Sequence, residues 1–355
     1  MGGGLNRAAG TPAVPAQEAS TPPGRRPGMM DVARLAGVSH QTVSRVINRP
    51  ESVRPATLAK VRDAINQLGY RPNMAARALV TDSTRMIGVV TTGSHFQGPA
   101  STTAAIEVAA RQVGYATLVT ALKRDERDAE KEIREAFDFL IARGVDGIIA
   151  VAPQTWIATS TERVARAVPL VVVADGLAPS ERIHVVSVDQ ELGARMAVGH
   201  LLGLGRETVA HLAGPQDWYD ALARARGWRI GLEDAGHEAP PMLVGDWSAE
   251  CGYEAGTEMV ARGLPEAVFC ANDLMALGML AALRDQGVRV PEDIAVVGFD
   301  DTPGTAFFSP PLTTVRQPFD ELGVLCMEVL LRAIDGEAGA THSISPTLRV
   351  RRSSC

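Results

Sequence analysis

The 355-residue chain contains no uninterrupted apolar segment of the roughly 18 residues that a membrane-spanning helix requires. Residues 1–28 are rich in Gly, Ala and Pro and have no apolar segment of the kind found in secretory signals, so we expect a disordered tail there. Both absences favour a cytoplasmic protein without a membrane partner.

Cysteine is also scarce, and the four cysteines have no spacing typical of a zinc site or a disulfide framework. The sequence lacks a Gly-x-Ser-x-Gly nucleophile elbow, a P-loop and a His-Glu-x-x-His motif. Its histidines are scattered, and none pairs with an evident nucleophile. We therefore predict no catalytic residue, no metal site and no cofactor.

Charge is distributed unevenly along the chain. Residues 1–85 carry 12 Lys and Arg against 5 Asp and Glu, whereas the remaining residues carry 23 against 36. A basic amino-terminal segment on an acidic body is typical of a protein that binds a polyanion through that segment alone.

Residues 31–48 have the pattern of two short helices joined by a tight turn. Gly37 suits the turn, and Ser39 is a typical N-cap for the second helix, which would bury Val43 and Val46. Its opposite face carries side chains that can bond base edges and phosphates, namely His40, Gln41, Thr42, Ser44 and Arg45. The pattern favours a helix-turn-helix that places its second helix in the DNA major groove, and an ordinary helical hairpin is the alternative.

Two further helices are predicted after this motif. The first covers residues 55–68, and the second covers residues 73–79, where Pro72 favours a helix start and Asn73 can cap it. A helix this short is unstable alone, so we expect it to form only against a partner.

From Met86 onwards strands and helices alternate, which predicts parallel sheets covered on both faces. The predicted strands cover residues 86–92, 116–121, 147–151, 170–175, 185–188, 209–214, 267–271 and 294–299. The predicted helices include residues 101–113, 126–143, 193–204, 221–235, 249–262 and 274–286. Two such series predict two Rossmann-like subdomains.

Polar side chains follow several of these strands. Ligands of open α/β sheets bind beyond the carboxyl ends of the strands, where Thr92, Asp175, Asn272 and Asp300 are placed. Asp273 is expected to cap the helix that begins at residue 274. Carboxylates and an amide, together with the guanidinium of Arg224 and the indole of Trp247, suit a polyhydroxylated sugar. Asp175 and Asp300 could alternatively serve as the acid–base pair of a glycosidase.

Two patterns, DVA..AGVS..TVSRV.N at residues 31–48 and GY.PN..AR.L at residues 69–79, together resemble the LacI/GalR family of bacterial transcription repressors. The resemblance extends from about Met30 to Arg351. The stretches at residues 245–250 and 311–317 are most similar to the lactose-repressor branch of the family. The Gly28-Met29-Met30 sequence departs from the usual β-branched opening, and we expect it to weaken the start of the first helix.

The resemblance implies an α-helical helix-turn-helix DNA-binding domain plus an α/β effector domain of two Rossmann-like, periplasmic-binding-protein-like subdomains. The implied boundaries are a tail at 1–28, the DNA-binding domain at 29–72, a hinge helix and linker at 73–85, and the effector-binding and dimerisation domain at 86–355. Subdomain one would comprise about 86–187 plus 319–345, and subdomain two about 188–318 plus the carboxyl-terminal end.

The resemblance also assigns site residues. Those expected to contact DNA are Ser39, His40, Gln41, Thr42, Ser44, Arg45, Asn48, Asn73, Ala76 and Leu79. The residue at Leu79 would wedge into the minor groove. Those expected to bind the effector are Thr92, Phe96, Gln97, Pro99, Asp175, Arg224, Trp247, Asn272, Asp300, Gln317 and Phe319. Two positions depart from the lactose-repressor branch, which has tyrosine at His40 and serine at Asp220.

The expected partners are double-stranded palindromic operator DNA, a small-molecule sugar effector and a second copy of the chain. A galactoside-like glycoside is the favoured effector, with another β-glycoside or a purine as alternatives. We expect a homodimer rather than a tetramer, because the sequence has no leucine-heptad helix near its end. A free-standing sugar-binding protein is the remaining alternative, which the DNA-binding motif disfavours.

Overall fold

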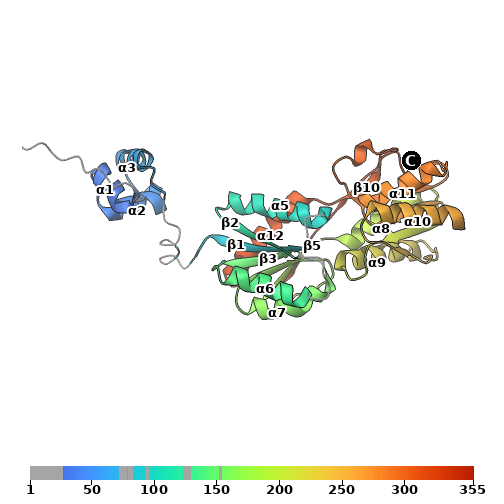
Figure 1. Cartoon of the computed structure of the whole chain (residues 1–355), viewed down its shortest axis with the longest axis horizontal. Helices are drawn as coiled ribbons and strands as arrows, with labels where there is room; N and C mark the ends of the chain where they lie inside the picture. Colours follow the sequence, from blue (N-terminus) through green and yellow to red (C-terminus); the bar gives the residue numbers. More distant parts are fainter. Residues whose placement is uncertain (1–26, 72–77, 79–82, 93–95, 123–128, 152–153) are drawn as a thin grey trace, which may run out of the picture. The chain divides into compact units, whose positions relative to one another are not determined.

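The structure is a computed structural model that describes residues 27–71, 78, 83–92, 96–122, 129–151 and 154–355 (Figure 1). The contacts within the chain divide it into two units, Met1–Asp82 and Ser83–Cys355. Each unit has its own hydrophobic core, and each is described by itself.

The first unit is built from the helices α1 (Met29–Ala36), α2 (His40–Asn48) and α3 (Pro55–Leu68), with a short 3-10 turn, η1 (Pro50–Ser52), after α2. The observed bounds of α3 are those predicted. The core of this unit is small, with buried side chains that include Val32, Val43, Val46, Val61 and Tyr70.

Local signals fix the ends of these helices. Gly37 has φ +64°, a left-handed conformation that glycine adopts without steric cost, and it turns the chain between α1 and α2. The Ser39 hydroxyl accepts a hydrogen bond from the Thr42 backbone N–H at 3.2 Å, so the predicted N-cap is confirmed. The expected weakening of α1 is not observed, because the Asp31 carboxylate accepts the Gly28 N–H at 2.8 Å and stabilises the helix start.

The second unit contains two sheets. The strand order of the first sheet is β11-β5-β4-β3-β1-β2, and its pairs are parallel. Its strands are β1 (Met86–Thr92), β2 (Ala116–Leu122), β3 (Gly147–Val151), β4 (Leu170–Val173), β5 (Ile183–Val188) and β11 (Thr341–Ile344).

Helices cover both faces of the first sheet. Two of them, α5 (Gln97–Gln112) and α12 (Phe319–Ile334), pack together over one face. On the other face lie α6 (Ala129–Ile141) and α7 (Ala158–Ala165), which follows the 3-10 turn η3 (Thr155–Ile157) (Figure 1). The helix predicted at residues 101–113 is α5, which begins four residues earlier, at Gln97.

The second sheet has the strand order β12-β10-β9-β8-β6-β7, and only β12 is antiparallel to its neighbour among the pairs that the structure describes. Its strands are β6 (Val209–Ala213), β7 (Leu243–Val244), β8 (Ala267–Cys270), β9 (Ala295–Asp300), β10 (Thr313–Arg316) and β12 (Thr347–Arg349). A 3-10 turn, η4 (Thr305–Phe307), follows β9.

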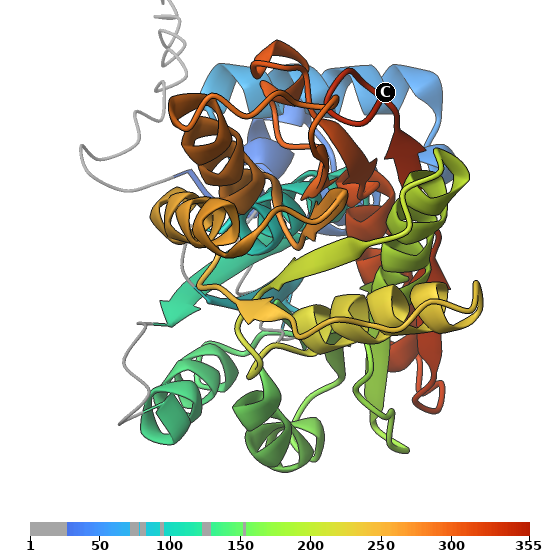
Figure 2. The same ribbon diagram turned by 90° about the vertical axis from the view of Figure 1, so that its right-hand side faces the viewer.

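Figure 2 shows the second sheet between two pairs of helices. On one face lie α8 (Gln190–Gly203) and α9 (Tyr219–Glu233), and on the other lie α10 (Ala249–Arg262) and α11 (Asp273–Asp285). The two sheets form the cores of two subdomains. The chain crosses between them from β5 to α8, from β10 to α12 and from β11 to β12.

The second unit begins at Ser83, whereas the predicted linker extends to residue 85. Ser83 and Thr84 donate hydrogen bonds to the Asp146 carboxylate, as does the Arg85 backbone N–H. These bonds lower the pKa of Asp146 against the effect of its burial. Residues 83–85 therefore belong structurally to the second unit.

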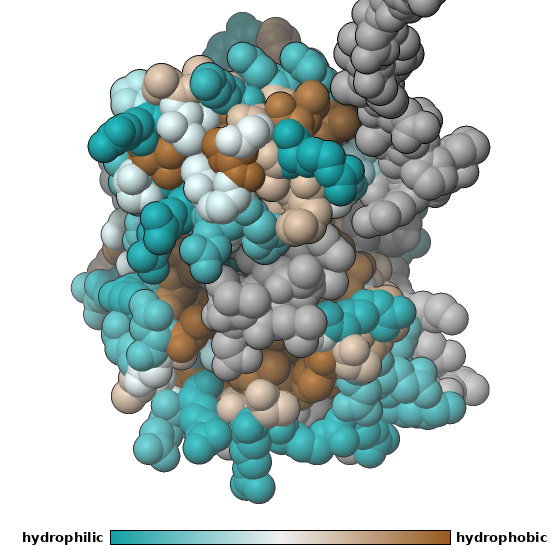
Figure 3. Space-filling model, turned by 90° about the vertical axis from the view of Figure 1, so that its left-hand side faces the viewer, coloured by the Kyte–Doolittle hydropathy of each residue, from teal (hydrophilic) through white to brown (hydrophobic). Residues whose placement is uncertain are grey.

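The surface seen in Figure 3 mixes hydrophilic residues with smaller hydrophobic patches. Among the helices of the described ranges, none has the length and apolar character needed to cross a membrane.

Candidate functional site

The outer face of α2 presents exposed polar side chains that make no hydrogen bond or ion pair among the described residues. His40, Gln41 and Arg45 are exposed, whereas Val43 and Val46 of the same helix are buried. Within the described residues, these three side chains make no hydrogen bond or ion pair with the rest of the chain. They are therefore available to a ligand outside the first unit.

The other polar residues predicted on α2 are engaged locally. The hydroxyls of Ser39 and Thr42 lie 2.9 Å apart, and the Asn48 amide donates to the Ser44 backbone oxygen at 3.0 Å. These contacts stabilise the two ends of α2. Asn73, Ala76 and Leu79, the remaining residues predicted to contact DNA, lie outside the described residues.

The second unit contains a cavity of about 60 Å³ between its two subdomains, beyond the carboxyl ends of the strands. Nine of the eleven residues predicted to bind the effector line it. They are Phe96, Gln97, Pro99, Arg224, Trp247, Asn272, Asp300, Gln317 and Phe319. We call this space the cleft cavity.

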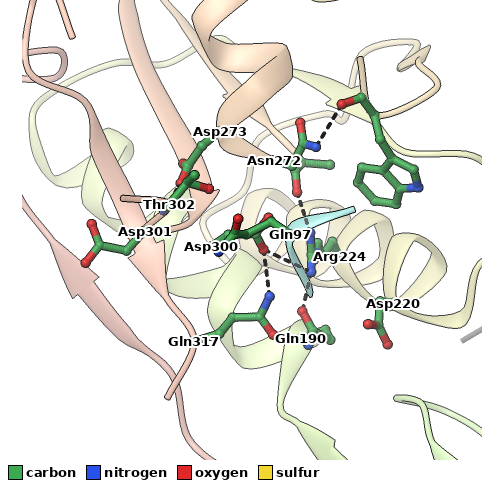
Figure 4. Close-up of polar contacts among 12 residues, drawn as sticks. Gln97, Gln190, Asp220, Arg224, Asn272, Asp273, Asp300, Asp301, Thr302 and Gln317 are labelled. Carbon is green, nitrogen blue, oxygen red and sulfur yellow. Dashed lines mark hydrogen bonds and ion pairs between the residues drawn. The ribbon is translucent and has the colours of Figure 1, made fainter. Parts of the chain in front are cut away.

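A chain of buried polar side chains lies along one wall of the cleft cavity (Figure 4). Gln317 donates to Asp300 at 2.6 Å, Gln190 donates to Gln317 at 2.9 Å, and the Arg224 Nε–H donates to Gln190 at 2.9 Å. The Arg224 guanidinium lies 3.7 Å from Asp300, which closes the chain into a ring. Gln190 and Gln317 are thereby fixed in orientation.

Arg224 is held firmly in this ring. Its guanidinium carbon lies 3.9 Å from the centre of the Phe299 ring and 5.6 Å from that of the Trp247 ring, and its Nη1 donates to the Ala271 carbonyl. Its position on the second turn of α9, rather than at the helix start, aims it at the carboxyl ends of β8 and β9. Each guanidinium nitrogen therefore already faces a protein group.

Asn272 positions the strand-to-helix connection beside the ring. Its side-chain oxygen accepts the Met275 N–H at 2.8 Å, and its amide donates to the Trp247 carbonyl at 3.0 Å. Asn272, not Asp273, is therefore the N-cap of α11, and the prediction for Asp273 is wrong. Asp273 is the first residue of the helix, where its carboxylate accepts the Thr314 hydroxyl at 2.6 Å and the Thr302 N–H at 2.7 Å.

Two lining residues have backbone conformations that side-chain-bearing residues rarely adopt. Trp247 has φ +75° and Asp300 has φ +111°. Such conformations cost free energy and occur frequently where a ligand is bound. Neither conformation was predictable from residue type, because neither position is glycine.

Aromatic rings from both subdomains form a second wall of the cleft cavity. The Phe96 and Trp218 rings have centroids 5.0 Å apart and meet edge to face, and Trp218 and Trp247 do so at 5.6 Å. Gly214 lies directly beneath the Trp247 indole, where a Cβ atom would overlap it. This wall suits the apolar face of a sugar ring.

Thr92 and Asp175 do not line the cleft cavity. Thr92 is the last residue of β1 and is buried with a hydroxyl that has no hydrogen-bond partner among the described residues. Asp175 follows β4, and its carboxylate accepts the Gln190 backbone N–H at 2.8 Å. The Asp175 N–H donates to the Asp220 carboxylate at 3.1 Å.

Each of the buried carboxyl groups in and around the cleft cavity has a raised pKa. Burial raises the pKa of Asp175 to about 6, with a further contribution from the charge of Asp220. Burial also raises the pKa values of Asp220, Asp273 and Asp300, although the Arg224 charge opposes the increase at Asp220 and Asp300. The site therefore places four carboxyl groups near one guanidinium, and their burial favours the protonated forms.

Comparisons with known proteins identify both units. Residues 28–73 match the model of bacterial regulatory proteins of the lacI family, and residues 198–355 match the periplasmic binding protein-like domain. The lactose operon repressor of Escherichia coli (strain K12) is 35% identical over 326 residues, 91% of this chain and 89% of that protein. The chain belongs to the LacI family.

A second relative of this LacI-family protein is the HTH-type transcriptional regulator CelR of Thermobifida fusca. It is 37% identical over 328 residues, which are 88% of this chain and 93% of that protein. The chain is thus similar to transcription regulators over most of its length.

Solved structures give the same result. The Lac repressor bound to ONPG in its repressed state has a TM-score of 0.81 at 34% identity, covering 93% of this chain and 100% of that one. A complex of the regulator CelR with cellobiose has a TM-score of 0.69 at 32% identity, covering 92% and 100% of the two chains. The predicted fold class of this LacI-family protein is confirmed.

Five polar or aromatic residues of the cavity are absent from the predicted list of effector ligands, namely Thr102, Ser187, Gln190, Trp218 and Asp220. Gln190 begins α8 directly after β5, so the rule that ligands bind beyond strand ends would have found it. Asp220 lies on α9, one turn before Arg224, and lines the cavity on the same side. Trp218 had no sequence signal, because its contact with Phe96 forms only when the two subdomains meet.

Proposed function

We propose that this LacI-family protein is a transcriptional repressor of sugar-utilisation genes that a sugar effector releases from its operator. The effector would bind in the cleft cavity of the second unit, and the operator would be bound by the first unit. Binding and release would take place in the cytoplasm. The observation that carries the proposal is the buried ring of Asp300, Gln317, Gln190 and Arg224 at the cleft cavity.

The outer face of α2 supports the DNA-binding part. His40, Gln41 and Arg45 would read base edges in the major groove, since they are exposed and unengaged. Ser39, Thr42, Ser44 and Asn48 would contact phosphates or position the helix. Asn73, Ala76 and Leu79 would complete the contact in the minor groove.

The chemistry of the cleft cavity supports a polyhydroxylated ligand. Asp300 and Asn272 present oxygen and amide groups whose orientations are fixed by Gln317 and the Trp247 carbonyl. Vicinal hydroxyls both donate to carboxylates and accept from amides, so a sugar can satisfy both. The Trp218–Trp247 wall would cover the apolar face of the ring.

The relatives favour a glycoside. One is named for the lactose operon, and another is seen with cellobiose. A galactoside-like glycoside is our leading effector, with another β-glycoside second. A purine is the remaining candidate from a different chemical class.

A glycosidase activity is disfavoured by the position of Asp175. Its carboxylate is bound by the Gln190 N–H and does not line the cleft cavity, so it cannot meet a substrate together with Asp300. We propose that the chain has no catalytic residue and binds the sugar without altering it.

We propose further that the protein is a homodimer. Exposed apolar side chains lie on α10, α11 and η4, where Tyr253 is 40%, Leu277 38% and Phe307 91% exposed. Exposed apolar side chains of this size are typical of a surface that a second subunit covers. A dimer with paired α2 helices matches a palindromic operator.

The test uses fluorescence anisotropy with a labelled palindromic duplex selected for binding to the full chain. We expect affinity to fall by about 10³–10⁵-fold between roughly 50 and 200 mM salt, because the basic residues displace counterions from phosphates. Addition of methyl β-galactoside or methyl β-glucoside should then release the duplex. A salt-independent affinity would overturn the DNA-binding part, and a failure of every sugar to bind would overturn the effector class.

A further inference from the structure

The charge balance of the cleft cavity distinguishes this protein within the proposed function. Among the residues that line it, Asp220 and Asp300 carry carboxyl groups and Arg224 is the one Lys or Arg. Arg224 is committed to the ring, where its nitrogens face Gln190, Ala271 and Asp300. Asp220 therefore faces the cavity without an ion-pair partner among the described residues.

A second carboxylate lies close to Asp220. Asp175 belongs to the loop after β4 in the first subdomain, and Asp220 belongs to α9 in the second, so the two meet across the cleft. The cation nearest Asp175 is Arg226, which is 48% exposed and lies 3.4 Å from Glu191. The cleft thus brings two carboxyl groups together, and no Lys or Arg among the described residues forms an ion pair with either.

Closure of a cleft around a ligand removes water from such a pair. Desolvation of an unpaired carboxylate is costly, and a second carboxylate nearby increases the cost. A proton can offset the cost, and burial raises the pKa of Asp175 to about 6 and also raises that of Asp220. A cation supplied by the ligand also offsets it, because it stabilises the ionised form of Asp220.

We propose that the effector of this protein is a sugar that carries a protonated amine, and that Asp220 is the residue that selects it. The inference rests on the proposed function of the cleft cavity. An ammonium group donates up to three hydrogen bonds and neutralises the charge of Asp220, whereas a hydroxyl leaves that charge in place. A sugar with a carboxylate or phosphate is rejected, because every guanidinium nitrogen of Arg224 already faces a protein group.

The lactose-repressor branch resembles this chain at the stretch after β9 but has serine where this chain has Asp220. The serine hydroxyl carries no charge to be neutralised. The aspartate therefore changes the preferred ligand from a neutral glycoside to an amino sugar without altering the ring of Asp300, Gln317 and Gln190.

The test is isothermal titration calorimetry of the full chain at neutral pH with D-galactosamine, D-galactose and D-galacturonate. We expect galactosamine to bind about tenfold or more tightly than galactose, since a charge-assisted hydrogen bond is worth roughly 1.4 kcal/mol more than a neutral one. Galacturonate should bind weakest. D-Glucosamine against D-glucose repeats the comparison for the other ring configuration.

The variant Asp220→Asn keeps the acceptor for the Asp175 N–H and removes the charge, so it should reduce the preference for the amine to within about twofold. Asp217→Asn makes the same change outside the cavity lining and should keep the preference. Tighter binding of the neutral sugar to the wild type would overturn the inference, and so would an amine preference that survives Asp220→Asn. Either result would leave the proposed function intact. Binding of none of these sugars would overturn the inference and the proposed sugar class together.

Discussion

The substitution Asp175→Asn tests the electrostatics of the cleft without any ligand. Asparagine has the same shape as aspartate, and its oxygen can still accept the Gln190 N–H, but it carries no negative charge opposite Asp220. We therefore expect the variant to be more stable than the wild type at neutral pH.

The magnitude follows from the pKa of Asp175, which is raised from 3.8 to about 6 in the folded protein. A difference of about 2 pKa units corresponds to roughly 3 kcal/mol of unfolding free energy. Because the folded state holds the proton more tightly, the wild type is stabilised at low pH, and this contribution is lost as the pH rises through the window from 3.8 to about 6. Asparagine behaves as the protonated form at every pH.

The assay is urea unfolding of both proteins, without ligand, at a series of pH values. The variant should exceed the wild type by up to about 3 kcal/mol above pH 7, and the difference should roughly halve at pH 5. Asp217→Asn, which lies outside the cavity lining, is the control and should show no such trend. A difference between Asp175→Asn and the wild type that does not change with pH would refute the reasoning.

Three further predictions concern the separate parts of the protein. Arg45→Ala should weaken operator binding by about tenfold or more in an anisotropy titration while leaving the thermal midpoint unchanged, because the side chain is exposed and unengaged. Asp300→Asn should bind operator normally but lose most of the response to sugar, since it loses the charge-assisted bonds of a buried carboxylate; loss of operator binding with a normal sugar response would contradict this role. Phe307→Asp should shift light-scattering mass from dimer to monomer, because it places a charge on an apolar patch.

The sequence was sufficient for the parts of the fold that local chemistry determines. The N-cap at Ser39 and the turn at Gly37 were predicted from residue type, and both depend on backbone geometry within a few residues. Eight strands of the second unit were predicted from continuous apolar runs, and their observed ends coincide with the predicted ones or differ by one or two residues. The strands β7, β10, β11 and β12 were not predicted.

The parts that failed depend on contacts between distant segments. Thr92 was expected to face the effector from the carboxyl end of β1, yet its side chain is buried and does not line the cavity. Asp175 was assigned to the effector because it follows a strand, but the Gln190 N–H binds its carboxylate outside the cavity. Asp273 was expected to cap α11, but its carboxylate accepts hydrogen bonds from the distant Thr314 and Thr302. The neighbouring Asn272 caps the helix.

Operator affinity measured with and without a bound effector tests the central claim most directly. Our account predicts that saturating effector weakens operator binding by about 5- to 150-fold, and that saturating operator weakens effector binding by the same factor, since coupling between two sites is reciprocal. The titration should use a sugar whose binding calorimetry has already established. An unchanged or increased operator affinity in the presence of that bound sugar would contradict the account.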